Sequence, residues 1–172
     1  MIYPTANDVL RCIDQTLAES ADADLPAMAR KSALASCRHL VRHVELRLRL
    51  ERGLLQEDAE RLAALLPGVA DYLADSGSEG PAQATAIRQQ LSRPAPASDD
   101  GSDDLEPLRA HVLALREALY QALALLQKLD ASRRESATYQ ALREGIRGYI
   151  REELQQEDLL IHDAFVGQGP RR

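Results

Sequence analysis

Aromatic residues are scarce in this chain, making up 3% of its 172 residues, with no Trp and a single Phe. A core that lacks large rings has to be built from Leu, Ala, Val and Ile. Leu and Ala are strong helix formers, and no stretch alternates apolar and polar residues over the length of a strand. The sequence therefore predicts an all-α protein. Aromatic residues are also absent between the basic ones, which argues against a surface for single-stranded nucleic acid.

Cysteines and long apolar runs are few as well. Cys12 and Cys37 are the two cysteines, and their spacing is neither that of a CxxC motif nor that of a metal site. Both fall on predicted apolar faces, so we expect them to be small buried hydrophobes. No apolar run is long enough to cross a bilayer. The start, Met1 to Pro4, has no basic segment followed by an apolar core, so we expect no signal peptide. We expect a cytoplasmic protein without a membrane partner.

Excess positive charge is also lacking. The formal net charge is −6, which argues against nucleic acid as a partner. The acidity is concentrated in residues 57–104 and peaks at Asp99, Asp100, Asp103 and Asp104. Residues 92–104 combine this charge with Pro, Ser and Gly and have no apolar surface to bury. They are predicted to form an exposed linker.

Helix signals divide the rest of the chain. Helices are predicted from a Thr5 cap to Ser20, from Pro26 to about Gly53, from about Glu57 to Asp75, and over 82–91, 105–130 and 133–163. Pro67 is expected to kink or split the third of these, because proline removes a backbone donor. Short connections at 20–25, 53–56 and 130–132 make neighbouring helices antiparallel. The sequence thus predicts an up-and-down bundle of four or five helices, in one domain over 1–172 that contains the 92–104 linker.

The clearest pattern is an apolar stripe at alternating four- and three-residue spacing in the fifth predicted helix. This spacing places all its members on one helix face. Ser132, with Glu135 three residues later, has the form of a capping box, so a new helix is expected to begin there. Together these features predict a tight helical hairpin. The stripe consists of Leu108, Val112, Leu115, Leu119, Ala122, Leu126 and Leu129.

The second predicted helix has two opposite stripes. Its apolar stripe is Leu34, Cys37, Val41, Val44 and Leu48, and its charged stripe is Arg38, Arg42, Glu45, Arg49 and Arg52. Arginine suits bidentate recognition of carboxylate or phosphate. The chain has only two lysines, so the alternative is that its arginines reflect a base composition that favours Arg codons.

His39 and His43 lie at the border between these two stripes. Histidines four residues apart can bind one metal ion. However, Leu40 stands where a helical metalloprotease motif needs Glu, and the Glu-x-x-His motif of di-iron bundles does not occur. We therefore interpret both as boundary histidines that bond to a neighbour or to water, and expect neither a metal nor a cofactor.

The last predicted helix carries an acidic cluster and two glycines. Paired carboxylates can perform acid–base chemistry if burial separates their pKa values. Arg147 and Arg151 lie within helical reach, which favours ordinary surface ion pairs, and only Glu153 falls at an inward position. Gly145 and Gly148 favour a close approach of another helix over a ligand pocket. The acidic cluster consists of Glu152, Glu153, Glu157 and Asp158.

Two segments in the first third of the chain are informative, the run Tyr3 to Leu10 and the helix from Arg30 through Val41–Leu46 to Leu50–Glu51. On these segments the chain resembles a family of small uncharacterised bacterial helical proteins. Members tend to be encoded beside aminoglycoside-phosphotransferase-like kinases and acyl-CoA-dehydrogenase-like enzymes. The family has no established catalytic residues to carry over. The resemblance implies an accessory role in a small metabolic gene cluster.

No catalytic motif emerges from the sequence. We therefore expect a non-enzymatic interaction protein, either an accessory subunit of an enzyme or a homodimer. The alternative is a bundle that binds a small acyl or phosphorylated ligand between helices, either as a binding protein or as an enzyme. Its candidate contacts are Arg38, His39, Arg42 and His43, with a hydroxyl from Tyr120, Tyr139 or Tyr149.

Overall fold

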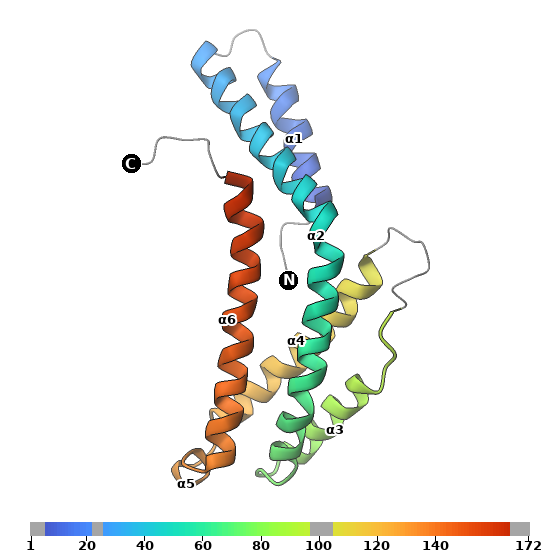
Figure 1. Ribbon diagram of the computed structural model, residues 1–172, viewed down its shortest axis with the longest axis vertical. Helices are drawn as coiled ribbons and strands as arrows, with labels where there is room; N and C mark the ends of the chain where they lie inside the picture. Colours follow the sequence, from blue (N-terminus) through green and yellow to red (C-terminus); the bar gives the residue numbers. More distant parts are fainter. Residues whose placement is uncertain (1–5, 22–25, 97–104, 166–172) are drawn as a thin grey trace. The chain divides into compact units, whose positions relative to one another are not determined.

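The computed structural model describes residues 6–21, 26–96 and 105–165 (Figure 1). The described residues form six α-helices and no strands, which confirms the all-α prediction. None of these helices is both long and apolar enough to span a membrane. The Thr5 cap and residues 97–104 of the predicted linker lie outside the described residues. The helices are α1 (Ala6–Ser20), α2 (Ala27–Ala74), α3 (Gly80–Leu91), α4 (Glu106–Leu126), α5 (Ala131–Arg134) and α6 (Ala137–Phe165).

The chain divides into two compact units. The first comprises Met1–Arg52 and Leu154–Arg172, and the second comprises Gly53–Glu153. The two longest helices, α2 and α6, contribute residues to both.

In the first unit, α1 lies alongside the N-terminal part of α2 as a hairpin (Figure 1). Its buried core is small, with Val9 and Ile13 from α1 and Cys37 and Val44 from α2. The Cys37 thiol donates to the carbonyl oxygen of Ile13 at 3.9 Å. Such a core covers only a narrow strip of α2.

Two expectations about this hairpin were therefore wrong. Cys12 is exposed. Within the predicted apolar stripe of α2, Leu34, Val41 and Leu48 are 51%, 50% and 77% exposed, respectively. The reason is geometric, because one short helix can cover only the residues that face it directly.

The second unit has a larger core. The predicted stripe of α4 is confirmed, since six of its members are buried and Leu129 packs against them. Leu62, Leu66, Val69 and Leu73 of α2 meet this stripe, together with Ile87 of α3 and with Tyr139, Ile146 and Tyr149 of α6.

Within this unit, α2 and α6 run antiparallel. The Tyr72 and Tyr139 rings are 6.0 Å apart, and towards the N-terminal side of α2 Arg61 meets Glu152. Between these two contacts, a Cβ on Gly145 would lie 3.4 Å from Leu65 Cδ1, which agrees with the expected close approach. Gly148 serves no such purpose, because a Cβ there would meet no described atom within 4 Å.

The predicted break at 53–56 is wrong, since α2 is a single helix of 48 residues. Glycine inside a helix costs about 1 kcal/mol relative to Ala, which weakens a helix but does not end it. Pro67 also lies inside the helix. Both Pro67 and Ala63, whose carbonyl loses its donor, are exposed. Water can therefore hydrate that carbonyl, which lowers the cost of the proline.

The cap after α4 is also different from the prediction. Asp130, and not Ser132, is the N-cap of α5 and accepts from the backbone N–H of Arg133 at 2.8 Å. Ser132 donates to the same carboxylate at 2.8 Å. These hydrogen bonds hold the pKa of Asp130 below its usual value. The Ser136 hydroxyl then accepts from the Tyr139 N–H at 3.2 Å at the start of α6.

Two glycines shape the turn between α2 and α3. Gly77 has a φ of 61°, a conformation that L side chains rarely adopt. A Cβ on Gly80 would lie 2.2 Å from the carbonyl oxygen of Leu73, a backbone atom that cannot move aside cheaply. The turn can close only if residue 80 has no side chain.

Replacing Gly80 with Ala is therefore expected to lower the free energy of unfolding by about 1–3 kcal/mol, the usual cost of overpacking. The matched control is Gly53→Ala in the middle of α2, where an added Cβ meets no described atom within 4 Å. This variant is expected to raise stability by up to about 1 kcal/mol. Urea denaturation followed by circular dichroism measures both. A destabilising Gly53→Ala would contradict the continuous helix.

Candidate functional site

The first predicted site lies on the α1–α2 hairpin. Arg38 and Arg42 line an open hollow of about 740 Å³. The other lining residues are Ile13, Leu17, Leu34, Cys37 and Val41. The hollow is therefore mainly apolar, with two guanidinium groups among its lining residues.

The histidines are not part of this hollow. His39 and His43 are half-buried and do not line it. Of the four predicted contact residues, the structure thus brings only the two arginines together at the hollow. Among the described residues, no three His, Cys, Asp or Glu side chains gather closely enough to hold a metal ion.

The three candidate tyrosines belong to the second unit, so none of them completes a site with Arg38 inside the first. Tyr120 is largely exposed, whereas Tyr139 and Tyr149 are buried in the core.

The second unit contains a buried polar cluster that sequence reasoning missed in large part. Arg116 of α4 donates through Nε to Asp58 Oδ2 of α2 at 2.8 Å, and its Nη2 lies 2.7 Å from the same oxygen. The Nη2 group also pairs with Glu153 of α6. One guanidinium group therefore joins carboxylates from two other helices.

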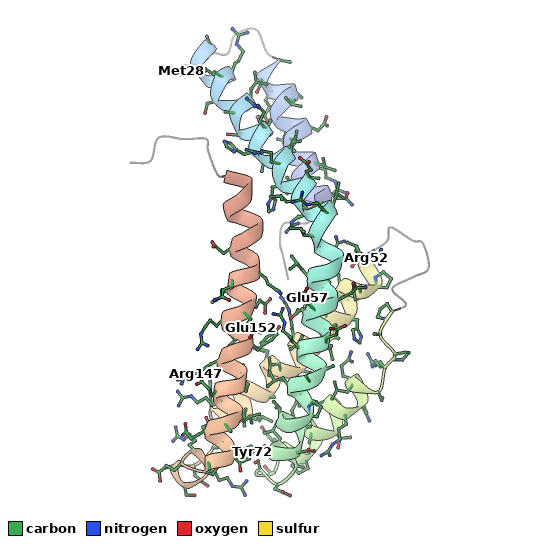
Figure 2. All side chains as sticks on the ribbon, in the orientation of Figure 1. Met28, Arg52, Glu57, Tyr72, Arg147 and Glu152 are labelled. Atoms are coloured by element: carbon green, nitrogen blue, oxygen red, sulfur yellow. The ribbon has the colours of Figure 1, made fainter. Side chains whose placement is uncertain are left out.

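The ion pairs of α6 differ from the predicted ones. Glu152 pairs with Arg61 of α2 at 3.5 Å, and Figure 2 shows it reaching from α6 towards that helix. Arg147 and Arg151 pair with Glu144, at 3.8 and 3.7 Å, respectively. Charge spacing along one helix could not reveal these partners, because Glu152 and Glu153 pair across helices.

Burial dominates the electrostatics of this cluster. Asp58 is only 2% exposed, and burial raises the pKa of its carboxyl from the usual 3.8 to about 6. The neighbouring Tyr149 hydroxyl lowers this pKa, the Glu153 charge raises it and Arg61 lowers it, each by less than burial does. Burial, followed by the negative charge of Asp58, also raises the pKa of the Tyr149 hydroxyl above its usual range.

Two atoms of the cluster are incompletely satisfied. Asp58 Oδ1 and the Tyr149 hydroxyl are buried, and neither has a hydrogen-bond partner of good geometry among the described residues. A buried polar atom without such a partner costs free energy. Keeping Asp58 charged in the core therefore costs free energy, even with Arg116 on its other oxygen.

The role of this cluster is to hold helices α2, α4 and α6 together. None of the three hollows on the α1–α2 hairpin, between α4 and α6, and beside Tyr72 is lined by Asp58, Arg116 or Glu153. The sequence did contain one signal for Asp58, because Leu55, Asp58 and Leu62 fall on the same buried phase of α2.

Comparison of the chain with models of protein families, with curated proteins and with solved structures found no match. The site is therefore interpreted from its own chemistry.

The raised pKa of Asp58 predicts a pH dependence of stability. Between about pH 6 and pH 4 the folded chain holds a proton on Asp58 that the unfolded chain has released. Lowering the pH through this window should therefore stabilise the fold, by up to about 3 kcal/mol from this group. The measurement is the free energy of unfolding as a function of pH. Subtracting the same curve for the Asp58→Asn variant removes the contribution of the other carboxylates. A wild type that loses stability relative to Asp58→Asn as the pH falls would contradict this assignment.

The bridging role of Arg116 predicts a large loss of stability on its removal. Arg116→Met removes the cation that Asp58 and Glu153 share. Breaking a buried ion pair lowers the free energy of unfolding by about 3–5 kcal/mol. Because Arg116 is 21% exposed at its side chain, we expect the lower end of this range. The control is Arg88→Met, which breaks the exposed Arg88–Asp71 pair at 2.8 Å and should cost no more than about 1 kcal/mol. Equal losses in chemical denaturation would contradict the bridging role.

Proposed function

We propose that this chain is a non-enzymatic helical interaction protein of the cytoplasm that works as a homodimer. The observation that carries the proposal is the uncovered apolar face of the α1–α2 hairpin. Leu34, Val41 and Leu48 are exposed at seven-residue intervals on α2, and Leu10 and Leu17 are exposed at the same interval on α1. Seven-residue repetition is the pattern by which helices pair along a seam.

Three of these five side chains lie together. Leu17, Leu34 and Val41 line the same hollow, so the α1 and α2 stripes adjoin each other. The hairpin also needs more burial than it has, because only four of its described residues form a buried apolar core. Helical hairpins gain most of their stability from packing of this kind. A second hairpin laid over the face would turn two helices into a four-helix bundle.

Charge complementarity favours a second copy of this chain as the occupant. Helix α1 has three carboxylates, Asp8, Asp14 and Glu19, against one arginine. The facing part of α2 is rich in arginine, with Arg38 and Arg42 at the hollow. In a two-fold dimer the same patch meets itself, so the acidic helix of one copy can lie against the basic helix of the other. The sequence resemblance alone supports the additional proposal that this dimer assists an enzyme.

The test uses apolar substitutions. Replacing Leu34, Val41 and Leu48 together with Gln should weaken dimerisation at least about 100-fold, since each buried side chain contributes on the order of 1 kcal/mol per copy. Analytical ultracentrifugation over a concentration series measures the dissociation constant. The control is Leu113→Gln, an apolar side chain of α4 that is 44% exposed. A wild-type chain that stays monomeric at all concentrations would overturn the proposal.

Charge reversal provides a second and sharper arm. Arg38→Glu with Arg42→Glu makes both helices acidic, and Asp14→Arg with Glu19→Arg makes both basic. Each double variant should be monomeric alone, whereas a mixture of the two should form a heterodimer, because opposite charges then meet at both contacts. If the mixture stays monomeric, charge pairing between copies is excluded.

A further inference from the structure

The second unit has a hollow that the proposed dimerisation does not use. It lies between α4, α5 and α6 and has a volume of about 370 Å³, within the range of small-molecule sites. Three arginines line it, Arg134 at the end of α5 and Arg143 and Arg147 on α6, and no carboxylate does. Figure 2 labels Arg147 on α6. We call this hollow the arginine groove.

The positive charge of the groove is incompletely compensated. Arg147 pairs loosely with Glu144 at 3.8 Å, and Glu144 is shared with Arg151. The guanidinium groups of Arg134 and Arg143 form no hydrogen bond or ion pair with any described residue. Arg134 is attracted by the Asp130 carboxylate, but this is the smallest of the effects on the pKa of Asp130. Arg143 and Arg147 are also one helical turn apart, a spacing at which like charges repel. A bound anion would relieve this repulsion.

The rest of the lining is apolar. Tyr139 and Ile146 are buried beneath the groove, and Ile150 is 44% exposed at its edge. Leu123 and Leu126 line it from α4, and Gln127 adds a side-chain amide. A hydrated inorganic anion would leave this surface unused, and a neutral apolar molecule would leave the arginines uncompensated. A molecule with both parts would satisfy both.

The geometry points to a binding site for a small anionic amphiphile, with a carboxylate or phosphate head on the arginines and an apolar body on the wall of Tyr139, Ile146 and Ile150. Arginine is suited to either head group because its planar guanidinium donates two parallel hydrogen bonds. The head group is partly exposed to solvent, so binding should weaken as the salt concentration rises.

Titration calorimetry with four probes tests this site. Decanoate or decyl phosphate should bind saturably, one per chain, and the tighter of the two identifies the head group. Decanol and inorganic phosphate should each bind at least tenfold more weakly, because each lacks one of the two parts. Decanol that binds as tightly as both anions, or binding without saturation, would overturn the proposal.

Variants locate the site. Arg134→Glu and Arg143→Glu should each weaken binding of the tighter probe about tenfold, with the fold unchanged by circular dichroism. The matched control is Arg88→Glu on α3, 52% exposed at its side chain and outside the groove lining, which should change the affinity less than twofold. If all three variants weaken binding equally, the effect is one of net charge and the groove is not the site.

Discussion

The packing of the second unit depends on one guanidinium group held between two carboxylates. Leucines of α2 and α4 are the most frequent residues of the buried core. Similar side chains repeat along both helices, so leucine alone allows neighbouring registers with similar burial. Arg116 pairs with Asp58 on one helix and with Glu153 on another, and a shift of any of the three helices would separate a buried charge from its partner. Such a separation costs several kcal/mol, more than a modest loss of apolar contact. The cluster therefore specifies one arrangement of α2, α4 and α6, and the incomplete hydrogen bonding of Asp58 and Tyr149 is the cost of that specificity.

The two units differ in how fully they bury their own apolar residues. In the second unit, α4 contributes residues to the core along almost its whole length, and α2, α3 and α6 pack around it. Among its described residues, the first unit has a core of four buried apolar side chains, while a comparable number of leucine and valine side chains stay exposed beside it. A hairpin of this composition gains free energy from any surface that covers the exposed stripe. The seven-residue spacing favours a helical partner surface, since helices pair along seams with this period.

The helices could be predicted from sequence where the signal is local, and the long-range features could not. The buried face of α4 follows from spacing alone, because one helix face recurs with a fixed period whatever it packs against. The continuity of α2 did not follow, because Gly53 and Pro67 are local signals of a break that the surrounding helix overrides. The Arg38–Arg42 pair was found because both residues lie on one helix, but the exclusion of His39 and His43 from their hollow depends on where α1 lies. Asp58 and Arg116 are 58 residues apart in the chain, and their pairing becomes visible only when two helices are placed side by side.

Arginine illustrates why residue type alone predicted so little about function here. Arg116, Arg88 and Arg143 are chemically identical. The first bridges two shielded carboxylates, the second forms an exposed pair, and the third lines the groove and forms no ion pair with a described residue. A guanidinium group whose charge is neutralised inside the core stabilises the fold, and it has little further attraction to offer a ligand. A guanidinium group that lies on an apolar wall without a counter-ion can still attract an anionic ligand. The attraction that this chain can offer an anionic group therefore lies in the arginine groove and at Arg38 and Arg42 of the α1–α2 hairpin.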